Sequence, residues 1–222
     1  MDWTALALSV RLGFFTCLIL LPIGVLLGRL LAYRHFPGKG FAEAALALPL
    51  VLPPTVIGFY LLVGFGAASP FGQAWQAVFG GTLVFSFEGL LLASVLINLP
   101  FAVQPMQRGF EAIPKEVREA AAVNGMPPWR VLTQIDLPLA WPGVVGGMVL
   151  TFAHTLGEFG VVLMVGGSIP GETRTIAISI YDRVQAFDMR AAALMSATLL
   201  GLSLIALGLT FALSRLRRHD HG

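Results

Sequence analysis

His154 and Glu158 come closest, among the residues of this chain, to a pair that could do chemistry. They are four residues apart in an apolar run, so on a helix they share one face and can pair. A metal site is not favoured, because no second cluster of His, Cys or acidic residues accompanies them. A catalytic pair is not favoured either, since no nucleophile at a defined position supports it. An interhelical hydrogen bond that fixes packing and a functional polar group inside an apolar helix both stay open.

The elements that position this pair are predicted to be membrane-spanning helices. The chain is 56% hydrophobic and 12% charged, whereas soluble domains contain roughly 25% charged residues. Its apolar residues form long blocks, and a helix needs about 20 such residues to cross a bilayer. We expect an all-α membrane protein with about five transmembrane helices, in one domain over residues 1–222 with its core at about 8–214. The predicted spans are 10–31, 45–65, 83–103, 143–165 and 191–213.

Basic residues predict how these helices are oriented, because cytoplasmic loops carry an excess of Lys and Arg. The loop 66–82 has no basic residue, whereas three other segments are rich in them. We expect these three segments in the cytoplasm, which places the N-terminus outside and the C-terminus inside. The net charge of +2 is too small to indicate a nucleic-acid partner. The basic residues are Arg34 and Lys39 after the first span, Arg108, Lys115, Arg118 and Arg130 in the loop 107–141, and Arg215, Arg217 and Arg218 in the tail.

Three prolines interrupt the second predicted span at Pro49, Pro53 and Pro54. Proline removes a backbone donor, and irregular backbone at membrane depth is tolerated only against protein or a water-filled cavity. Broken helices of this kind often border a substrate path or a gate. We take the prolines as candidates for such a path, with a kinked packing helix as the alternative. Polar residues inside a membrane usually face the bundle interior, which adds as candidates Thr151, His154, Thr155 and Glu158.

The loop 107–141 carries the most specific pattern in the chain. Residues 117–123 favour a short helix, and Gly125 permits a tight turn. A second short helix can begin at Pro127 or Pro128, with Trp129 on its apolar face. We expect Pro138 and Pro142 to end the loop before the fourth span. The spacing of the loop runs Glu119-Ala120-Ala121, three residues, Gly125, nine residues, Ile135, one residue, Leu137-Pro138.

This spacing resembles the EAA loop of ABC importer permeases. The resemblance implies that the loop docks in a groove of a separate ATPase subunit and passes its closure to the spans. The chain has no G-x-x-x-x-G-K-[ST] phosphate loop, so ATP and Mg²⁺ are expected on that partner and no cofactor on this chain. The coupling residues so implied are Glu119, Ala120, Ala121, Gly125, Trp129, Ile135, Leu137 and Pro138.

Three further stretches, 48–54 with Gly58, 156–160 and 169–175, resemble the molybdate (ModB-type) permeases. The second stretch is shared with sulfate and thiosulfate permeases and indicates only the oxyanion class, whereas the third is the more molybdate-like. One departure is His154, where the relatives tend to carry arginine. In the third stretch, Glu172, Thr173 and Arg174 are candidates for an outer gate or for the docking of a binding protein.

The resemblance implies a type I importer permease core (MetI-like) that works as a homodimer. Its partners would be two copies of an ABC ATPase (ModC-type) and a periplasmic or lipid-anchored molybdate-binding protein (ModA-type), in the bacterial cytoplasmic (inner) membrane. Gly143 and Gly147 form a small-residue ridge that is a candidate for a two-fold contact. The implied function is ATP-driven import of molybdate, with sulfate, thiosulfate or tungstate as alternative substrates. An intramembrane enzyme using His154 and Glu158, or a secondary transporter, are the alternatives from other classes.

Overall fold

The computed structural model describes residues 1–219, with side chains up to residue 208. All regular structure in this part of the chain is helical. Residues 220–222 of the predicted domain lie outside the described residues. Arg215, Arg217 and Arg218 of the tail lie outside the part of the chain whose side chains are described. The elements are α1 (Trp3–Tyr33), α2 (Lys39–Val51), α3 (Pro54–Phe65), α4 (Pro70–Phe79), α5 (Phe87–Glu111), α6 (Lys115–Val123), α7 (Pro128–Val131), the π-helical turn η1 (Leu132–Asp136), α8 (Leu137–Gly157), α9 (Gly160–Gly166), α10 (Ile176–Gln185) and α11 (Met189–His219).

Four stretches of the described chain are long and apolar enough to cross a membrane: α1, α5, the run Pro128–Gly157, and Met189–Gly208 of α11. A fifth arises if α2 and α3 are counted as one span, although they are bent by 108°. The bend lies where Leu52 has an extended backbone before Pro53, and Pro54 begins the next helix. Proline disfavours helical backbone in the residue before it, which explains why the helix stops there. The prediction of an all-α protein with about five spans is confirmed.

The fourth predicted span differs in its boundaries from the structure. It begins at Leu137 rather than 143 and ends at Gly157, and α9 follows as a separate short helix. Pro138 and Pro142, expected to end the loop, instead lie in the first turn and in the interior of α8. A proline in the first helical turn loses no intrahelical bond, so Pro138 is compatible with the start of a helix. The expectation that these prolines stop the loop before the span was therefore wrong.

The centre of the bundle is formed by α1, α5 and α8, which pack against one another. At the crossing of α5 and α8, a Cβ atom on Gly143 would lie 2.5 Å from the carbonyl oxygen of Pro105. A Cβ on Gly147 would lie 2.9 Å from the carbonyl oxygen of Ala102. The small-residue ridge thus brings two helices of the same chain together. Packing against α5 therefore accounts for the ridge, and a two-fold contact is not needed to explain it.

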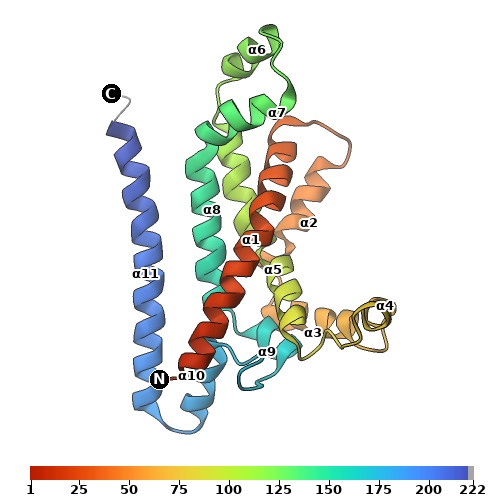
Figure 1. The fold of residues 1–222 in the computed structure, drawn as a ribbon, viewed down its shortest axis with the longest axis vertical. Helices are drawn as coiled ribbons and strands as arrows, with labels where there is room; N and C mark the ends of the chain where they lie inside the picture. Colours follow the sequence, from red (N-terminus) through yellow and green to blue (C-terminus); the bar gives the residue numbers. More distant parts are fainter. Residues whose placement is uncertain (220–222) are drawn as a thin grey trace.

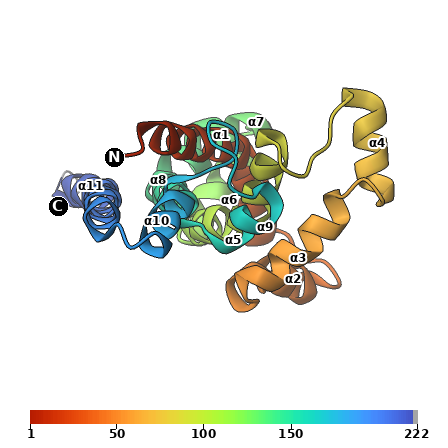
Figure 2. The same ribbon diagram turned by 90° about the horizontal axis from the view of Figure 1, so that it is seen from below.

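The two ends of the molecule carry different elements (Figure 1). The short helices α6 and α7 lie at the same end as the last described turn of α11, whereas the N-terminus, α9 and α10 lie at the other end. Seen along the bundle, α2, α3 and α4 project to one side of it (Figure 2). Their large apolar side chains are open, as at Phe41 (81% exposed), Val51 (79%) and Val78 (74%). Such a surface requires lipid or another protein to cover it.

Candidate functional site

The helices α6 and α7 form a small knob at one end of the bundle (Figure 1). Helix α6 ends at Val123, and Gly125 follows two residues later with a φ of +67°, in the left-handed region that favours glycine. The amide of Gly125 donates to the Ala122 carbonyl (3.0 Å), and that of Met126 donates to the Ala121 carbonyl (3.1 Å). These bonds satisfy carbonyls that the end of the helix leaves free. Pro128 then begins α7, so the structure has the two short helices joined at a glycine that the spacing indicates.

The surface of this knob is charged on one part and apolar on another. Glu119 pairs with Lys115 (2.9 Å), and this hydrogen bond together with the carboxylate charge raises the pKa of Lys115. Trp129 and Val123 are 61% and 88% exposed, whereas Ala121, on the inner side of α6, is buried. An exposed Trp beside a charged rim is the kind of surface that another protein covers.

Three of the four remaining predicted coupling residues lie outside the knob helices α6 and α7. Ile135 belongs to η1, and Leu137 and Pro138 belong to the first turn of α8. Ala120 is exposed on α6. The pattern therefore joins two structural parts, the knob itself and the start of the helix that follows it into the bundle.

Between these two parts lies a buried carboxylate that the sequence pattern did not single out. Asp136 is 0% exposed, and its Oδ2 accepts a hydrogen bond from Nε of Arg29 on α1 (2.7 Å). Arg118 of α6 lies 3.5 Å from the other carboxylate oxygen, with its guanidinium 3.4 Å from the ring centre of Tyr33. Aspartate is rarely fully buried unless it is paired. This rule would have drawn attention to Asp136 only after the helices around it had been placed.

The two predicted path motifs meet at breaks in their helices. A Cβ atom on Gly160, at the start of α9, would lie 2.7 Å from Cβ of Pro54, at the start of α3. Gly58, one turn along α3, faces the side chain of Met164 at 2.9 Å by the same measure. Pro49 lies inside α2. Pro53 lies in the bend between α2 and α3 and is the N-cap residue of α3. The break between α2 and α3 therefore packs against the break between α8 and α9.

A chain of polar side chains crosses the bundle beside these breaks. Nδ1 of His154 lies 3.0 Å from Oδ1 of Asn98 on α5, and its ring stacks on Phe101 with centroids 4.1 Å apart. The Asn98 amide donates to the Ser94 carbonyl (2.8 Å). The hydroxyl of Thr16 on α1 donates to Ser94 Oγ (2.9 Å). His154 thus makes the interhelical contact that the sequence left as one of its two interpretations.

Glu158 lies just beyond the end of α8 and has a structural partner of its own. Its Oε1 accepts a hydrogen bond from the Val161 amide (3.0 Å), which caps the start of α9. Its other oxygen lies 3.8 Å from Nε2 of His154. The expected pair is formed, but across a helix end rather than along one continuous helix. No cluster of three or more His, Cys, Asp or Glu suited to a metal occurs among the described residues.

Thr151 and Thr155 differ in how their hydroxyls are used. Thr155 donates to the Thr151 carbonyl (2.8 Å), whereas Oγ1 of Thr151 is buried without a hydrogen-bond partner in the part of the chain that is described. An unpaired buried hydroxyl costs free energy that an apolar isostere does not. It also leaves a free donor in the bundle interior.

We expect Thr151→Val to leave the unfolding temperature unchanged or to raise it, because no hydrogen bond is lost. Thr155→Val should lower stability by about 1 kcal/mol, the net contribution of one hydrogen bond. Thermal unfolding of the two purified variants in one detergent checks the comparison. Equal losses in both would show that Thr151 has a partner in the folded protein.

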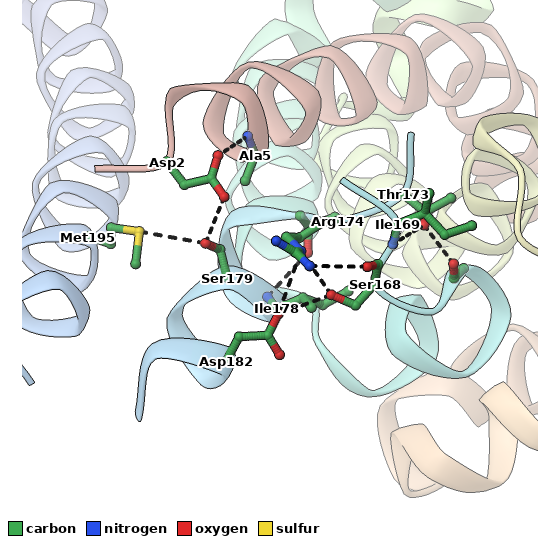
Figure 3. A network of polar contacts seen from close by, with 12 residues as sticks. Asp2, Ala5, Ser168, Ile169, Thr173, Arg174, Ile178, Ser179, Asp182 and Met195 are labelled. Carbon is green, nitrogen blue, oxygen red and sulfur yellow. Dashed lines mark hydrogen bonds and ion pairs between the residues drawn. The ribbon is translucent and has the colours of Figure 1, made fainter. Parts of the chain in front are cut away.

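At the opposite end, the loop 167–175 is closed by its own side chains (Figure 3). The buried hydroxyl of Thr173 donates to the Gly166 carbonyl (2.6 Å) and accepts from the Ile169 amide (3.1 Å). Arg174 donates to Ser168 Oγ (3.0 Å) and lies 3.6 Å from Asp182 of α10. Two of the three residues predicted for an outer gate or dock therefore hold the loop together. Glu172 is the exposed one.

The same face ties the N-terminus to α10 and α11. The Asp2 carboxylate accepts from the Ala5 amide (2.9 Å) and from the Ser179 hydroxyl (3.0 Å), which also lies 3.8 Å from the sulfur of Met195 (Figure 3). The Ile176 amide donates to the buried Ser9 hydroxyl (2.8 Å). These bonds link the N-terminus and α1 to α10 and to the beginning of α11.

Two cavities lie along α5 toward the knob. The larger, of about 540 Å³, lies between α2, α5 and α8 and is mostly apolar, with Gln104 and Arg108 among its lining. The second, of about 310 Å³, shares those two residues and adds Glu43, Gln107 and Glu111. The Gln107 amide donates to Glu43 (3.0 Å) and to Glu111 (2.9 Å). Arg108 forms no ion pair with any described residue, although Glu43 and Glu111 line the same cavity.

Comparison with known proteins identifies the architecture. The family model for the binding-protein-dependent transport system inner membrane component matches residues 21–219. The chain belongs to this family. It is therefore a multi-pass membrane permease component and not an enzyme, which removes the intramembrane enzyme and the secondary transporter as alternatives.

The permease is similar to curated proteins named for molybdenum transport. The Molybdenum transport system permease protein ModB of Azotobacter vinelandii is 44% identical over 221 residues, covering 100% of this chain and 96% of that protein. The Escherichia coli K12 protein of the same name is 36% identical, covering 100% and 97%. The sulfate transport system permease protein CysT of E. coli K12 is 32% identical, covering 83% of this chain and 66% of that protein.

Solved structures support the fold of the permease. A bacterial ABC transporter involved in the import of the acidic polysaccharide alginate matches with a TM-score of 0.70 at 15% identity, covering 97% of this chain and 78% of that chain. The same kind of transporter in complex with an alginate pentasaccharide-bound periplasmic protein matches with a TM-score of 0.71 at 17% identity. At these identities the likeness concerns the fold, which is that of an ABC importer permease.

Proposed function

We propose that this permease carries molybdate into the cell as the membrane subunit of an ATP-driven importer. The observation that supports this most strongly is the full-length similarity to two permeases named for molybdenum transport, at 44% and 36% identity. The sulfate permease is less similar and is matched over only part of its length. Tungstate, a close chemical analogue, is the alternative substrate within the same mechanism.

The permease would act as a homodimer with two ModC-type ATPase subunits and a ModA-type binding protein, periplasmic or lipid-anchored. The open apolar surface of α2, α3 and α4 supports a need for protein or lipid around the single chain. The knob of α6 and α7 offers the ATPase an exposed Trp129 and a charged rim. The N-terminus would lie outside and the knob and C-terminus in the cytoplasm, which agrees with the N-terminus and the knob lying at opposite ends of the bundle (Figure 1).

Transport would follow from the exchange between two states of the bundle. ATP binding would close the ATPases, draw the knobs together and open the helices toward the binding protein. A ligand shifts such an equilibrium only by binding one state better than the other. The breaks at Pro54 and Gly160, which contact one another, are the places where the backbone could change direction during that exchange. Glu172 is the exposed candidate on the face where the binding protein would dock.

The path for the anion would pass the polar chain around His154 and the cavities beside Arg108. A carrier should offer donors to a dianion without holding it tightly, and hydroxyls, amides and the guanidinium of Arg108 would meet that need. The polar side chains on this route are Thr151, His154, Asn98, Gln104 and Arg108.

We expect Arg108→Gln to lower molybdate uptake by about tenfold, the factor that corresponds to one charge-assisted hydrogen bond of roughly 1.4 kcal/mol. Arg108→Lys should restore part of the loss, because the charge returns. The matched control is Arg34→Gln, an exposed arginine of the same end that lines neither cavity. Uptake by cells with equal amounts of membrane-inserted permease checks the prediction, and equal uptake by both Gln variants would remove Arg108 from the path.

The proposed substrate is tested by uptake of radiolabelled molybdate at trace concentration in cells that lack this chain. Uptake should be lost on deletion, restored by the gene, inhibited by unlabelled tungstate and resistant to excess sulfate. If molybdate uptake persists and sulfate import falls instead, the substrate assignment is wrong while the family assignment stands.

A further inference from the structure

The buried carboxylate of Asp136 joins the coupling knob to the helix bundle. It lies in the π-helical turn η1, immediately before α8 begins. Arg29 of α1 holds one of its oxygens with a hydrogen bond of 2.7 Å. Arg118, in the middle of α6, approaches the other oxygen. The first of these contacts joins segments that are 107 residues apart in the sequence.

Further contacts extend this cluster to a fourth element. The Arg118 guanidinium stacks on the ring of Tyr33, at the end of α1, and the Tyr33 hydroxyl donates to the Phe110 carbonyl of α5 (2.9 Å). These contacts therefore connect α6 with α1, with α5 and with the beginning of α8. Apart from the chain itself, this is the polar contact by which the described part of α6 is tied to the membrane helices.

One bond in the cluster is not completed in this structure. Nε of Arg118 and Oδ1 of Asp136 are 3.5 Å apart, and both atoms are buried without a hydrogen-bond partner among the described residues. Charge-assisted bonds of this kind are about 2.7–2.9 Å long, so a shift of roughly 0.6 Å would complete it. Two buried polar atoms that face each other unpaired carry a penalty, which favours any movement that joins them.

We propose that Arg118 and Asp136 close this bond when the ATPase subunits draw the knob inward, and that Asp136 and Arg29 then pass the movement to α8 and α1. The proposal rests on the proposed function, because it requires an ATPase partner at the knob. Arg118, Asp136 and Arg29 act as positioning residues in this scheme. The bond is a contact with two arrangements, which is what a coupling element needs if both sites are to bias it.

The test uses the complete transporter, with its ATPase subunits and binding protein, reconstituted in proteoliposomes. ATP hydrolysis and molybdate uptake are measured together for wild type, Arg118→Gln, Arg118→Lys and the control Arg34→Gln. We expect Arg118→Gln to keep its ATP hydrolysis while uptake per ATP falls about tenfold or more, with a smaller loss in Arg118→Lys. Arg34→Gln should match wild type, because the Arg34 side chain is exposed and forms no ion pair within the described residues.

A second measurement follows the contact itself and does not depend on the substrate. Spin labels at position 116 on α6 and position 34 after α1, in a Cys17→Ala background, report the distance between these elements by electron paramagnetic resonance. Addition of a non-hydrolysed ATP analogue should shift this distance in the parent and leave it nearly unchanged in Arg118→Gln.

The outcomes separate this proposal from the assignment of the substrate. Wild-type transporter that hydrolyses ATP and shows the distance shift, but carries no molybdate, would overturn the substrate and support the coupling role. Arg118→Gln with wild-type uptake per ATP would overturn the coupling role. So would parallel losses of hydrolysis and uptake in both Arg118 variants with the distance shift intact, since that pattern belongs to a residue that only supports the fold.

Discussion

Gly143→Ala is expected to destabilise the folded permease. The added Cβ would lie 2.5 Å from the Pro105 carbonyl oxygen and 3.0 Å from the Gly109 Cα, and both are backbone atoms. Backbone cannot rotate away as a side chain can, so α5 and α8 must separate along their central contact. Overpacking of this kind costs about 1–3 kcal/mol and occasionally more, against a gain of up to ~1 kcal/mol from replacing glycine in a helix.

The matched control lies three residues further along the same helix. A Cβ atom on Gly146 meets nothing within 4 Å, so Gly146→Ala adds the same atom without a clash. The amount of monodisperse protein and its unfolding temperature in detergent are compared for the two variants. Equal behaviour would mean that the close crossing of α5 and α8 does not exist in the folded permease.

Gly125→Val is expected to abolish uptake while leaving the membrane bundle folded. The φ of +67° at this position is strongly unfavourable for a β-branched residue, at a cost of about 1–3 kcal/mol. The strain would change the angle at which α7 follows α6 and so the shape presented to the ATPase. If this free-energy cost is paid when the ATPase binds, the affinity for the ATPase falls by about 10- to 100-fold.

Gly125→Asn is the control, because asparagine adopts left-handed backbone more readily than other residues. A Cβ at this position meets no atom within 4 Å, so packing does not distinguish the two variants. Co-purification of the ATPase subunit with the permease, followed by uptake in cells, checks the prediction. Normal uptake with Val at position 125 would show that binding of the ATPase does not depend on the geometry of the turn between the two short helices.

The sequence was most informative where a residue has a strong local effect. Gly125 and Pro128 indicate the turn and the second helix of the knob without knowledge of their surroundings. Pro53 and Pro54 likewise predict a break in the second span, although not its angle of 108°. The knob, the number of spans and the break were therefore accessible, since each depends on a few adjacent residues.

Features that depend on distant partners could not be predicted in the same way. The apolar run continues past Gly157, so the sequence does not predict that α8 ends there. The structure shows the break, where Glu158 accepts a hydrogen bond from the Val161 amide of α9. Asp136 looks like an ordinary loop aspartate until Arg29 of α1 is placed beside it. Thr173 was assigned to an outer gate because of the stretch it belongs to, whereas its contacts are with its own loop.

The same reasoning explains why the small-residue ridge was ambiguous. Gly143 and Gly147 permit a close approach by any helix, and the spacing alone does not say which one arrives. The structure places α5 of the same chain there. A contact between two copies, as we propose, would then use other surfaces, such as the open apolar face of α2, α3 and α4.

The central claim, a permease whose movement is driven by ATP at the knob of α6 and α7, is tested most directly by transport with purified components. The permease, its ATPase subunits and the binding protein are reconstituted in proteoliposomes, and entry or exit of radiolabelled molybdate is measured with and without ATP. We predict ATP-dependent molybdate transport that is lost with Gly125→Val, retained with Gly125→Asn and resistant to sulfate. Molybdate movement that is independent of ATP, or unchanged with valine at position 125, would contradict this mechanism.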